Sequence, residues 1–254
     1  MEKSIVCFSN LAYHILNDNS RYIDNKRIIV EIFNFDNEKK IQLRLTVIDS
    51  YYSTQMNKRL YGLEDISKEL GQFNDAELKL IISQFLNSPN EGELIHIFQK
   101  KYGLNKSGHS QKKAISLITK YLYFLSNGQF PIYDDLGKLT YNLLRRNGYL
   151  LSSSINESNY FKKIIALNQN FQINDFEKLD NFLWLTGKLF SGSFSILMGK
   201  EKYIRITENI EFKKNISSSQ IDTIIRDYIK NNFKKLDVFS TKEKQFMEFV
   251  FSLE

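Results

Sequence analysis

Apolar side chains recur at every third or fourth position through most of the chain, a spacing that predicts amphipathic α-helices. Helices are expected over 4–16, 74–86, 92–103, 114–125, 136–148, 160–171, 176–190, 217–236 and 241–254, with two more inside 41–70. The stretch 27–35 fits either a strand or a further helix. In 114–125 apolar residues occur on all sides, so this helix should be buried at the centre of the fold. The pattern thus predicts a mainly α protein.

Short polar residues mark where several of these helices begin and end. The tripeptide Ser-Thr-Gln at 53–55 separates the two helices of 41–70 and suits a helix–turn–helix corner. Asn74 or Asp75 is expected to cap the helix that follows, and Thr241 is expected to cap the last helix.

The last quarter of the chain has a different pattern. Apolar and polar residues alternate in 193–199 and 202–207, which could form a β-hairpin across the intervening glycine. We therefore divide the chain into three parts. An N-terminal segment, 1–40, packs on a helical core, 41–192, and a C-terminal extension, 193–254, holds the possible hairpin and two helices.

Composition narrows the classes of function. The chain has 254 residues and a net charge of +6, which favours phosphate contacts without requiring them. Its single cysteine, Cys7, rules out an internal disulfide and a thiolate metal site, and the three histidines lack metal-ligand spacing. No apolar run has the length of a membrane span, and no signal peptide is recognisable. We expect a soluble protein of a reducing compartment, most simply the cytoplasm, with no cofactor or metal.

Charge is unevenly distributed around the predicted central helix. Between 94 and 156 the only carboxylates are those of Asp134 and Asp135. The same span contains nine cationic residues: Lys100, Lys101, Lys106, Lys112, Lys113, Lys120, Lys138, Arg145 and Arg146. A basic surface with one acidic pair suits an enzyme that acts on a polyanion, so we expect a nucleic-acid site with a lysine and an aspartate at its centre. Either aspartate could instead serve only as the N-cap of the next helix.

Four segments in this order resemble the helix-hairpin-helix DNA glycosylase superfamily, which includes bacterial endonuclease III and the 8-oxoguanine glycosylases. They are LRLTVIDSYYSTQMNKRLYGLEDISKEL (43–70), KSGHSQKKA (106–114), FPIYDDL (130–136) and NFLWLTGKLFS (181–191). The resemblance covers about 40–192 and implies a helix-hairpin-helix glycosylase-like core. The cysteine cluster of the endonuclease III branch should be absent, because the chain has no cysteines to form it.

The resemblance also assigns roles to individual residues. Gln55 matches the residue that fills the hole left by an extruded base, and Gly108 matches the first glycine of the hairpin. Lys112 matches the catalytic lysine and Asp134 the catalytic aspartate. The hairpin departs from the family pattern at Ser110, which replaces the second glycine, so a phosphate contact through that amide is in doubt.

The register of the lysine leaves alternatives open. The spacing between Lys112 and Asp134 is a few residues longer than usual in the family. Lys113 is one position away, and Lys120 lies on the helix that leads to the aspartate.

The chemistry expected of such a pair follows from general principles. A lysine attacks C1′ of a nucleoside only as the neutral amine, and a nearby carboxylate can accept its proton and stabilise the positive sugar. The base must leave the stack and enter a pocket with aromatic walls, for which Tyr51, Tyr52, Tyr123 and Tyr133 are candidates. Side chains expected to hold the DNA backbone are Lys106, Lys113, Arg145 and Arg146.

These observations support three hypotheses. The first is a DNA glycosylase that flips and excises a damaged or modified base of double-stranded DNA, with strand nicking through a Schiff base, in DNA repair or phage defence. The second is a helix-hairpin-helix module that has lost catalysis and recognises DNA shape or modified bases. The third is a helical protein whose basic face meets an acidic protein.

Overall fold

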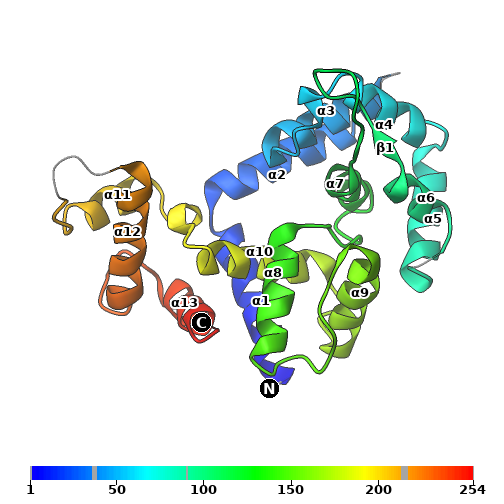
Figure 1. The fold of residues 1–254 in the computed structure, drawn as a ribbon. Helices are drawn as coiled ribbons and strands as arrows, with labels where there is room; N and C mark the ends of the chain where they lie inside the picture. Colours follow the sequence, from blue (N-terminus) through cyan, green and yellow to red (C-terminus); the bar gives the residue numbers. More distant parts are fainter. Residues whose placement is uncertain (1, 36–38, 90, 213–216, 254) are drawn as a thin grey trace. The chain divides into compact units, whose positions relative to one another are not determined.

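The computed structural model describes residues 2–35, 39–89, 91–212 and 217–253, and it is mainly α, as predicted (Figure 1). The α-helices in these residues are α1 (Glu2–Asn17), α2 (Ser20–Phe33), α3 (Lys40–Tyr52), α4 (Gly62–Leu70), α5 (Asp75–Asn87), α6 (Glu93–Gln99), α7 (Ile115–Leu125), α8 (Asp135–Arg146), α9 (Tyr160–Asn170), α10 (Phe176–Phe190), α11 (Lys200–Thr207), α12 (Ser218–Asn232) and α13 (Thr241–Phe251). The 3-10 helices are η1 (Met56–Lys58), η2 (Glu157–Asn159) and η3 (Phe194–Ile196). Two short strands, β1 (Lys101–Tyr102) and β2 (Lys112–Lys113), pair antiparallel.

The chain folds into two compact units, each built from separate segments. The terminal unit contains 1–19, 135–154 and 181–254, and the central unit contains 20–134 and 155–180. These boundaries differ from the predicted segments 1–40, 41–192 and 193–254. The physical reason is that distant segments pack together: α1 lies against α13, so both ends of the chain belong to one unit. Sequence periodicity does not report such long-range contacts.

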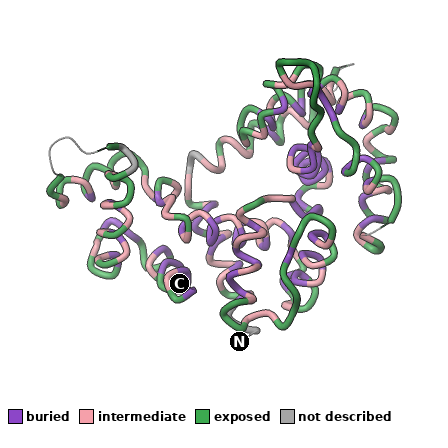
Figure 2. Tube along the Cα trace, viewed as in Figure 1, coloured by how far each residue is buried: buried purple, intermediate pink, exposed green. Residues whose placement is uncertain are grey.

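Helix α7 is the centre of the central unit. Every residue of α7 except Ser116 is buried, which confirms the buried helix predicted over 114–125 (Figure 2). It packs against α2, α3, α5 and α6 (Figure 1). A helix with apolar residues all round can exclude water only when other helices cover each of its sides.

Aromatic rings join the outer helices of the central unit. Phe98 of α6 stacks on Phe161 of α9, with ring centroids 5.0 Å apart, and both rings contact the fully buried Phe130. On another side, the buried guanidinium of Arg44 in α3 donates to Asp75 Oδ1 at 3.0 Å. These contacts fix the segment around Phe130 and the helix α3, both of which supply residues to the site described below.

The terminal unit also has an aromatic core. Phe8 of α1 stacks on Phe249 of α13 with centroids 4.0 Å apart, and Phe182 of α10 contacts the same ring. Gly187 allows α10 to approach α8 closely, because a Cβ there would lie 2.9 Å from Leu136. Helices far apart in the sequence thus share one core.

Capping boxes begin several helices, among them α5 and α13. Asn74 caps α5, because its side chain accepts the Glu77 amide while Glu77 accepts the Asn74 amide, and the predicted cap is confirmed. The cap predicted at Thr241 is wrong, since Ser240 caps α13. Ser240 and Glu243 form the reciprocal pair, which satisfies two amides that the helix itself leaves unbonded.

The β-hairpin expected within 193–207 is also a wrong prediction, because this stretch contains η3 and α11. The alternation there is compatible with a helix in which Ile206 is buried while Tyr203 and Ile204 are exposed. Lys202 of α11 pairs with Glu243 of α13 at 2.9 Å, a tertiary contact that anchors the helix. The antiparallel strands lie elsewhere, at β1 and β2. The stretch 27–35, left open from the sequence, belongs largely to α2.

Candidate functional site

Lys120 is a charged residue placed deep in the central unit. Its side chain is 4% exposed on α7. The ammonium Nζ donates a hydrogen bond to Ser116 Oγ at 2.7 Å, one helical turn earlier, and lies 5.3 Å from the centroid of the Tyr52 ring. Because a buried charge is costly unless polar or opposite charges surround it, Lys120 needs compensating groups nearby.

Those groups include two aspartates. Burial and, to a smaller extent, the negative charge of Asp134 raise the pKa of Asp180, on α10, to about 7, although the positive charge of Lys120 opposes the rise. Smaller effects come from Glu177, which also raises this pKa, and from Lys26, which lowers it. We call Lys120, Asp134 and Asp180 the lysine–aspartate cluster. A carboxyl group with a pKa near 7 exists in both protonation states at neutral pH, so it can accept or donate a proton.

The backbone that carries Asp134 is held by helices on two sides. The Tyr133 amide donates to Thr119 Oγ1 of α7 at 3.0 Å, and the Tyr160 hydroxyl of α9 donates to the Ile132 carbonyl at 2.6 Å. The Asp134 amide donates a longer bond, 3.4 Å, to the same Tyr160 oxygen. The aspartate is thereby positioned by α7, which also carries Lys120.

Tyrosine rings adjoin the cluster. Tyr133 and Tyr160 have centroids 4.7 Å apart. Burial raises the pKa of Tyr52, with Asp180 adding to the effect, and raises the pKa of Tyr160 in the same way. Of the predicted pocket walls, Tyr52 and Tyr133 therefore lie beside the cluster, whereas Tyr51 is an exposed residue of α3. These rings provide an apolar, π-rich boundary for the charged groups.

The predicted catalytic lysines occupy different environments. Lys112 is exposed on β2, where it stands opposite Tyr102 in the antiparallel register. Lys120 is the lysine whose charge acts on Asp180. Of the two, the structure brings Lys120 together with the aspartates.

The hairpin loop before Lys112 is stabilised by its own side chains. Gly108 has a φ of 77° and donates its amide to the Asn105 carbonyl at 2.9 Å. The side chain of Asn105 accepts the amides of His109, at 2.9 Å, and Ser110, at 3.3 Å. Since these amides already have acceptors, a phosphate at this loop would be bound through its side chains.

Gln55 lies exposed in the turn between α3 and α4, so the predicted corner is present. Its φ is 65°, in the left-handed region. The buried carboxylate of Asp49 holds this turn by accepting the Thr54 hydroxyl and the amides of Met56, at 2.9 Å, and Asn57, at 3.0 Å. The turn presents Gln55 to solvent on a fixed backbone.

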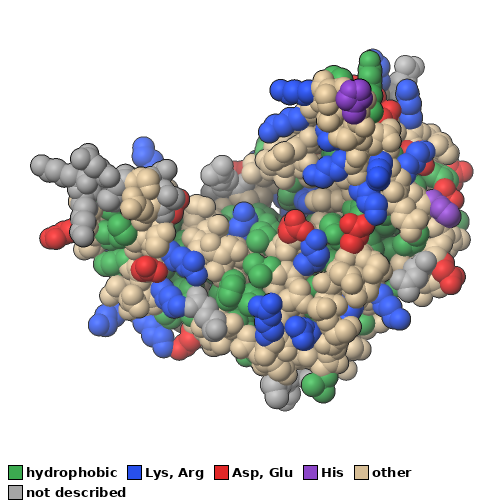
Figure 3. Space-filling model, viewed as in Figure 1, with side chains coloured by type: hydrophobic (Ala, Val, Ile, Leu, Met, Phe, Trp, Pro, Cys, Tyr) green, Lys and Arg blue, Asp and Glu red, His purple; other side chains and the backbone are tan. Residues whose placement is uncertain are grey.

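The remaining predicted DNA contacts are distributed over both units. Lys106 is exposed in the hairpin loop, and Lys113 pairs with Glu157 at 2.5 Å. Arg145 and Arg146 end α8 in the terminal unit. Figure 3 shows Lys and Arg side chains gathered over the hairpin end of the central unit.

No family model, curated protein or solved structure matches this chain. What the protein does must therefore be inferred from the burial, contacts and charges of its own residues.

The sequence did not predict one member of the cluster, Asp180, or two residues that contact the other members, Ser116 and Tyr160. Asp180 had a signal in the sequence, since it follows Phe176 by four positions and precedes Leu183 by three, which places a carboxylate on an apolar helix face. Ser116 lies one helical turn before Lys120. Tyr160 had no comparable signal, because its role depends on how α9 packs.

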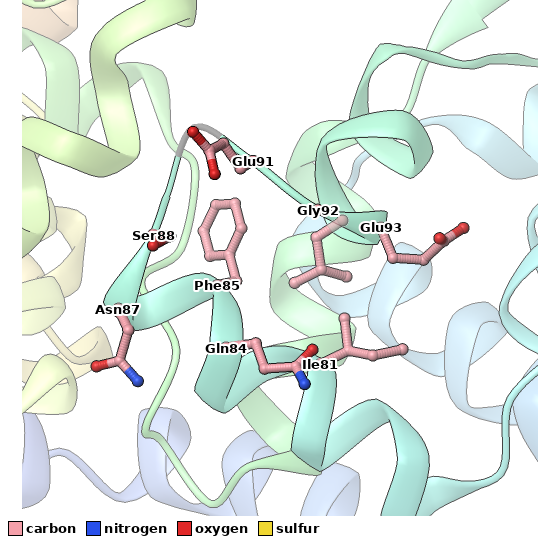
Figure 4. Close-up of a pocket in the computed structure, with 9 residues that line it drawn as sticks. Ile81, Gln84, Phe85, Asn87, Ser88, Glu91, Gly92 and Glu93 are labelled. Carbon is pink, nitrogen blue, oxygen red and sulfur yellow. The ribbon is translucent and has the colours of Figure 1, made fainter.

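A separate pocket of about 420 Å³ lies between the end of α5 and the start of α6 (Figure 4). It is lined by Ile81, Gln84, Phe85, Asn87, Ser88, Glu91, Gly92, Glu93 and Leu94. None of these belongs to the lysine–aspartate cluster. Figure 4 shows the carboxylate of Glu91 over the Phe85 ring, in the loop that joins α5 to α6, and the carboxylate of Glu93 at the start of α6. A phosphate would be repelled by these groups, so this pocket is not a candidate for the predicted nucleic-acid contacts.

The described residues contain neither a cluster of metal-ligating side chains nor a helix that could span a membrane. Among them, no three His, Cys, Asp or Glu side chains group so that they could hold a metal ion. No helix in the same part of the chain is long and apolar enough to cross a membrane. Cys7 is exposed.

Proposed function

We propose that the central unit carries a DNA N-glycosylase site that excises a damaged or modified base, with Lys120 as the nucleophile. The observation that supports this most is the position of Lys120. Its ammonium is almost fully buried, bonded to Ser116, and close enough to Asp180 to change the protonation of that carboxyl group. Covalent catalysis by a lysine needs such a setting, in which a proton can be transferred locally and water is excluded.

The chemical step uses the residues of the cluster as follows. Lys120 transfers a proton to Asp180, whose pKa of about 7 allows it to accept one at neutral pH. The neutral Nζ then attacks C1′ of the nucleotide. A C1′–N bond to the lysine forms as the bond between C1′ and the base breaks, and the base leaves with the electron pair and takes up the proton that Asp180 accepted. Positive charge that develops on the sugar is stabilised by the Asp134 carboxylate.

The same covalent intermediate leads to strand nicking. Opening of the sugar ring converts the lysine adduct into a protonated Schiff base. Loss of a proton from C2′ then expels the 3′ phosphate by β-elimination, and hydrolysis of the remaining imine returns Lys120. This sequence needs no oxidant or reductant.

The surroundings of the cluster suit an extruded base. Tyr52 and Tyr133 provide ring faces against which a flipped base can stack. Gln55, exposed on a fixed turn, would fill the space that the base leaves in the duplex. Lys112, exposed on β2, is better placed to contact phosphate than to attack C1′.

A second candidate function is DNA binding without excision. It is favoured by the charge balance of the cluster, because Asp134 and Asp180 could serve only to compensate a buried structural lysine. In that case the exposed lysines would bind the duplex and Lys120 would stabilise the fold.

Borohydride trapping tests the proposal. Duplexes that carry oxidised, deaminated, alkylated, abasic or hypermodified nucleotides are incubated with the protein and sodium borohydride, and base release is measured in parallel. We expect a covalent adduct and base release on at least one duplex, both lost in Lys120→Ala and retained in Lys112→Ala.

The controls separate chemistry from folding. Lys120→Met keeps most of the side-chain volume, so it should bind the same duplex while failing to form the adduct. Binding by the wild type with no adduct and no base release on any duplex would overturn the glycosylase proposal in favour of the binding module. An adduct lost in Lys112→Ala instead would contradict the assignment of the nucleophile.

A further inference from the structure

The turn after α3 and the hairpin before α7 form one continuous surface. Leu60 and Leu104 exchange both backbone hydrogen bonds, at 2.9 and 2.8 Å. The Arg59 guanidinium donates to the Ser110 carbonyl. Next to the Leu60–Leu104 pair, the backbones of Gly62 and Gly103 are in direct contact, because a Cβ on Gly103 would lie only 2.6 Å from the Gly62 Cα. We call residues 54–63 and 100–113 the turn–hairpin platform.

The platform exposes two large apolar side chains. Tyr61 is 66% exposed and Leu60 is 50% exposed. The φ of Tyr61 is 59°, a left-handed conformation that costs about 1 kcal/mol or more for a residue other than glycine. The fold keeps an aromatic residue exposed on strained backbone, where glycine would satisfy the geometry at lower cost. Strained backbone conformations of this kind cluster at ligand-binding and active sites.

The charge of the platform has a single sign. Its two segments contain seven Lys and Arg residues and no Asp or Glu. Arg59, Lys100 and Lys113 are engaged by other groups of the protein. The other four, Lys58, Lys101, Lys106 and Lys112, are exposed, and no ion pair among the described residues involves them. Four exposed lysines on the same platform as an exposed aromatic ring are complementary to a polyanion that also offers flat apolar faces.

We propose that the platform is the duplex-binding surface and that the Tyr61 ring, with Leu60 beside it, inserts against the base stack. The exposed lysines would contact phosphates on either side, and the aromatic ring would stack on a base where the duplex is distorted. This proposal rests on the proposed function for the identity of the polyanion. It adds a second insertion point to the one predicted at Gln55, on the other side of η1.

Nucleic acid fits the platform better than an acidic protein does. The carboxylates of an acidic protein would bind the lysines but would have no use for the exposed aromatic ring. Bases offer a π-face at every step, and each base–aromatic stack contributes about 1–3 kcal/mol.

The test measures duplex binding by fluorescence anisotropy, with 2-aminopurine next to an abasic-site analogue to report stacking. Because 1–3 kcal/mol corresponds to about 5- to 150-fold in affinity, Tyr61→Ala should weaken binding by that factor and abolish the 2-aminopurine response. Tyr61→Phe should retain both. Tyr203→Ala is the matched control, because Tyr203 is an exposed tyrosine of the terminal unit and should leave binding unchanged.

Tyr61→Gly keeps the result independent of folding. Glycine adopts a positive φ freely, so this variant should be at least as stable as Tyr61→Ala in denaturant titrations yet bind the duplex as weakly. Wild-type-like binding by Tyr61→Ala and Tyr61→Gly would overturn the inference, as would binding to polyglutamate in preference to the duplex.

The two proposals fail in different ways. Binding that depends on Tyr61, without adduct or base release, supports the platform and contradicts excision. Trapping at Lys120 that is indifferent to Tyr61→Ala supports excision and contradicts the insertion of Tyr61.

Discussion

Among single residues, Asp180 has an unusually high pKa for an aspartate. Its pKa is raised from 3.8 to about 7 by burial and by Asp134. At a pH between 3.8 and about 7, this carboxyl group is largely protonated in the folded protein and largely ionised in the unfolded chain. The contribution of Asp180 to the stability of the folded protein therefore decreases as pH rises from about 4 to 7, and it stays constant above that range. At 1.36 kcal/mol per pKa unit, the free energy of unfolding falls by at most about 4 kcal/mol over this range. The actual decrease is smaller, because the Asp180 side chain is partly exposed and solvent screens its charge.

Replacing this group should remove its share of the pH dependence. We expect Asp180→Asn to gain stability relative to the wild type as pH rises from 4.5 to 8, because the amide carries no charge to bury. The measurement is the free energy of unfolding of both proteins in urea at each pH. A difference between the two proteins that stays constant, or that shrinks as pH rises, would contradict the assigned direction.

The sequence named most of the cluster's residues but not their arrangement. Lys120, Asp134, Tyr52 and Tyr133 were candidates because of residue type and position, and the structure places them in one environment. The hairpin pattern favours Lys112 as the nucleophile, yet its side chain is exposed. Burial of a side chain depends on tertiary packing, which a local pattern does not report.

At the scale of elements, the turn that carries Gln55 depends on one buried carboxylate. Asp49 accepts the Thr54 hydroxyl and two backbone amides. Asp49→Asn should lower the free energy of unfolding by about 1.5–3 kcal/mol, because bonds to a charged acceptor are lost and the new NH₂ group faces donors. It should also speed hydrogen exchange at the amides of Met56 and Asn57. Exchange and urea unfolding would measure both effects.

The control for this change is Asp24→Asn. Asp24 is 55% exposed in an i,i+3 pair with Arg27, so its replacement should alter stability by no more than about 0.5 kcal/mol. Equal effects of the two substitutions would show that Asp49 does not organise the turn.

Helices were predictable where local signals agreed with tertiary packing. Apolar spacing predicted α7 and the Asn-Asp-Ala-Glu start predicted the cap of α5, because both depend on nearby residues. The hairpin expected within 193–207 failed, because alternation over so few residues also suits a short helix. There the contact between Lys202 and Glu243, 41 positions apart, supports the helix. The strands β1 and β2 were missed because two residues each are too few to show a period.

At the scale of the whole molecule, the interleaved units could not be predicted from composition. The segment 135–154 belongs to the terminal unit although residues on both sides of it belong to the central unit. No shift in composition marks these boundaries, because contacts between distant helices define them. Arg145 and Arg146, predicted to act with Lys106 and Lys113, consequently lie in a different unit from those lysines.

The exposed charges of the platform should govern how salt affects DNA binding. Each phosphate contact contributes about −0.9 to the slope of log K against log salt concentration, so four lysines should give about −4. Lys106→Ala and Lys112→Ala should each make the slope shallower by about 0.9. Lys79→Ala is the control, because Lys79 is exposed on α5 outside the platform. Anisotropy titrations from about 50 to 200 mM salt measure the slope, and equal slopes in all three variants would contradict the assignment.

The assignment of Lys120 as a nucleophile is tested most directly by mapping the trapped adduct. The wild-type protein is reduced with borohydride on the duplex that gives base release, digested, and analysed by mass spectrometry for the lysine that carries the sugar remnant. The account predicts modification of the peptide containing Lys120, on the Lys120 side chain itself. A remnant on Lys112 or Lys113, with Lys120 unmodified, would contradict it.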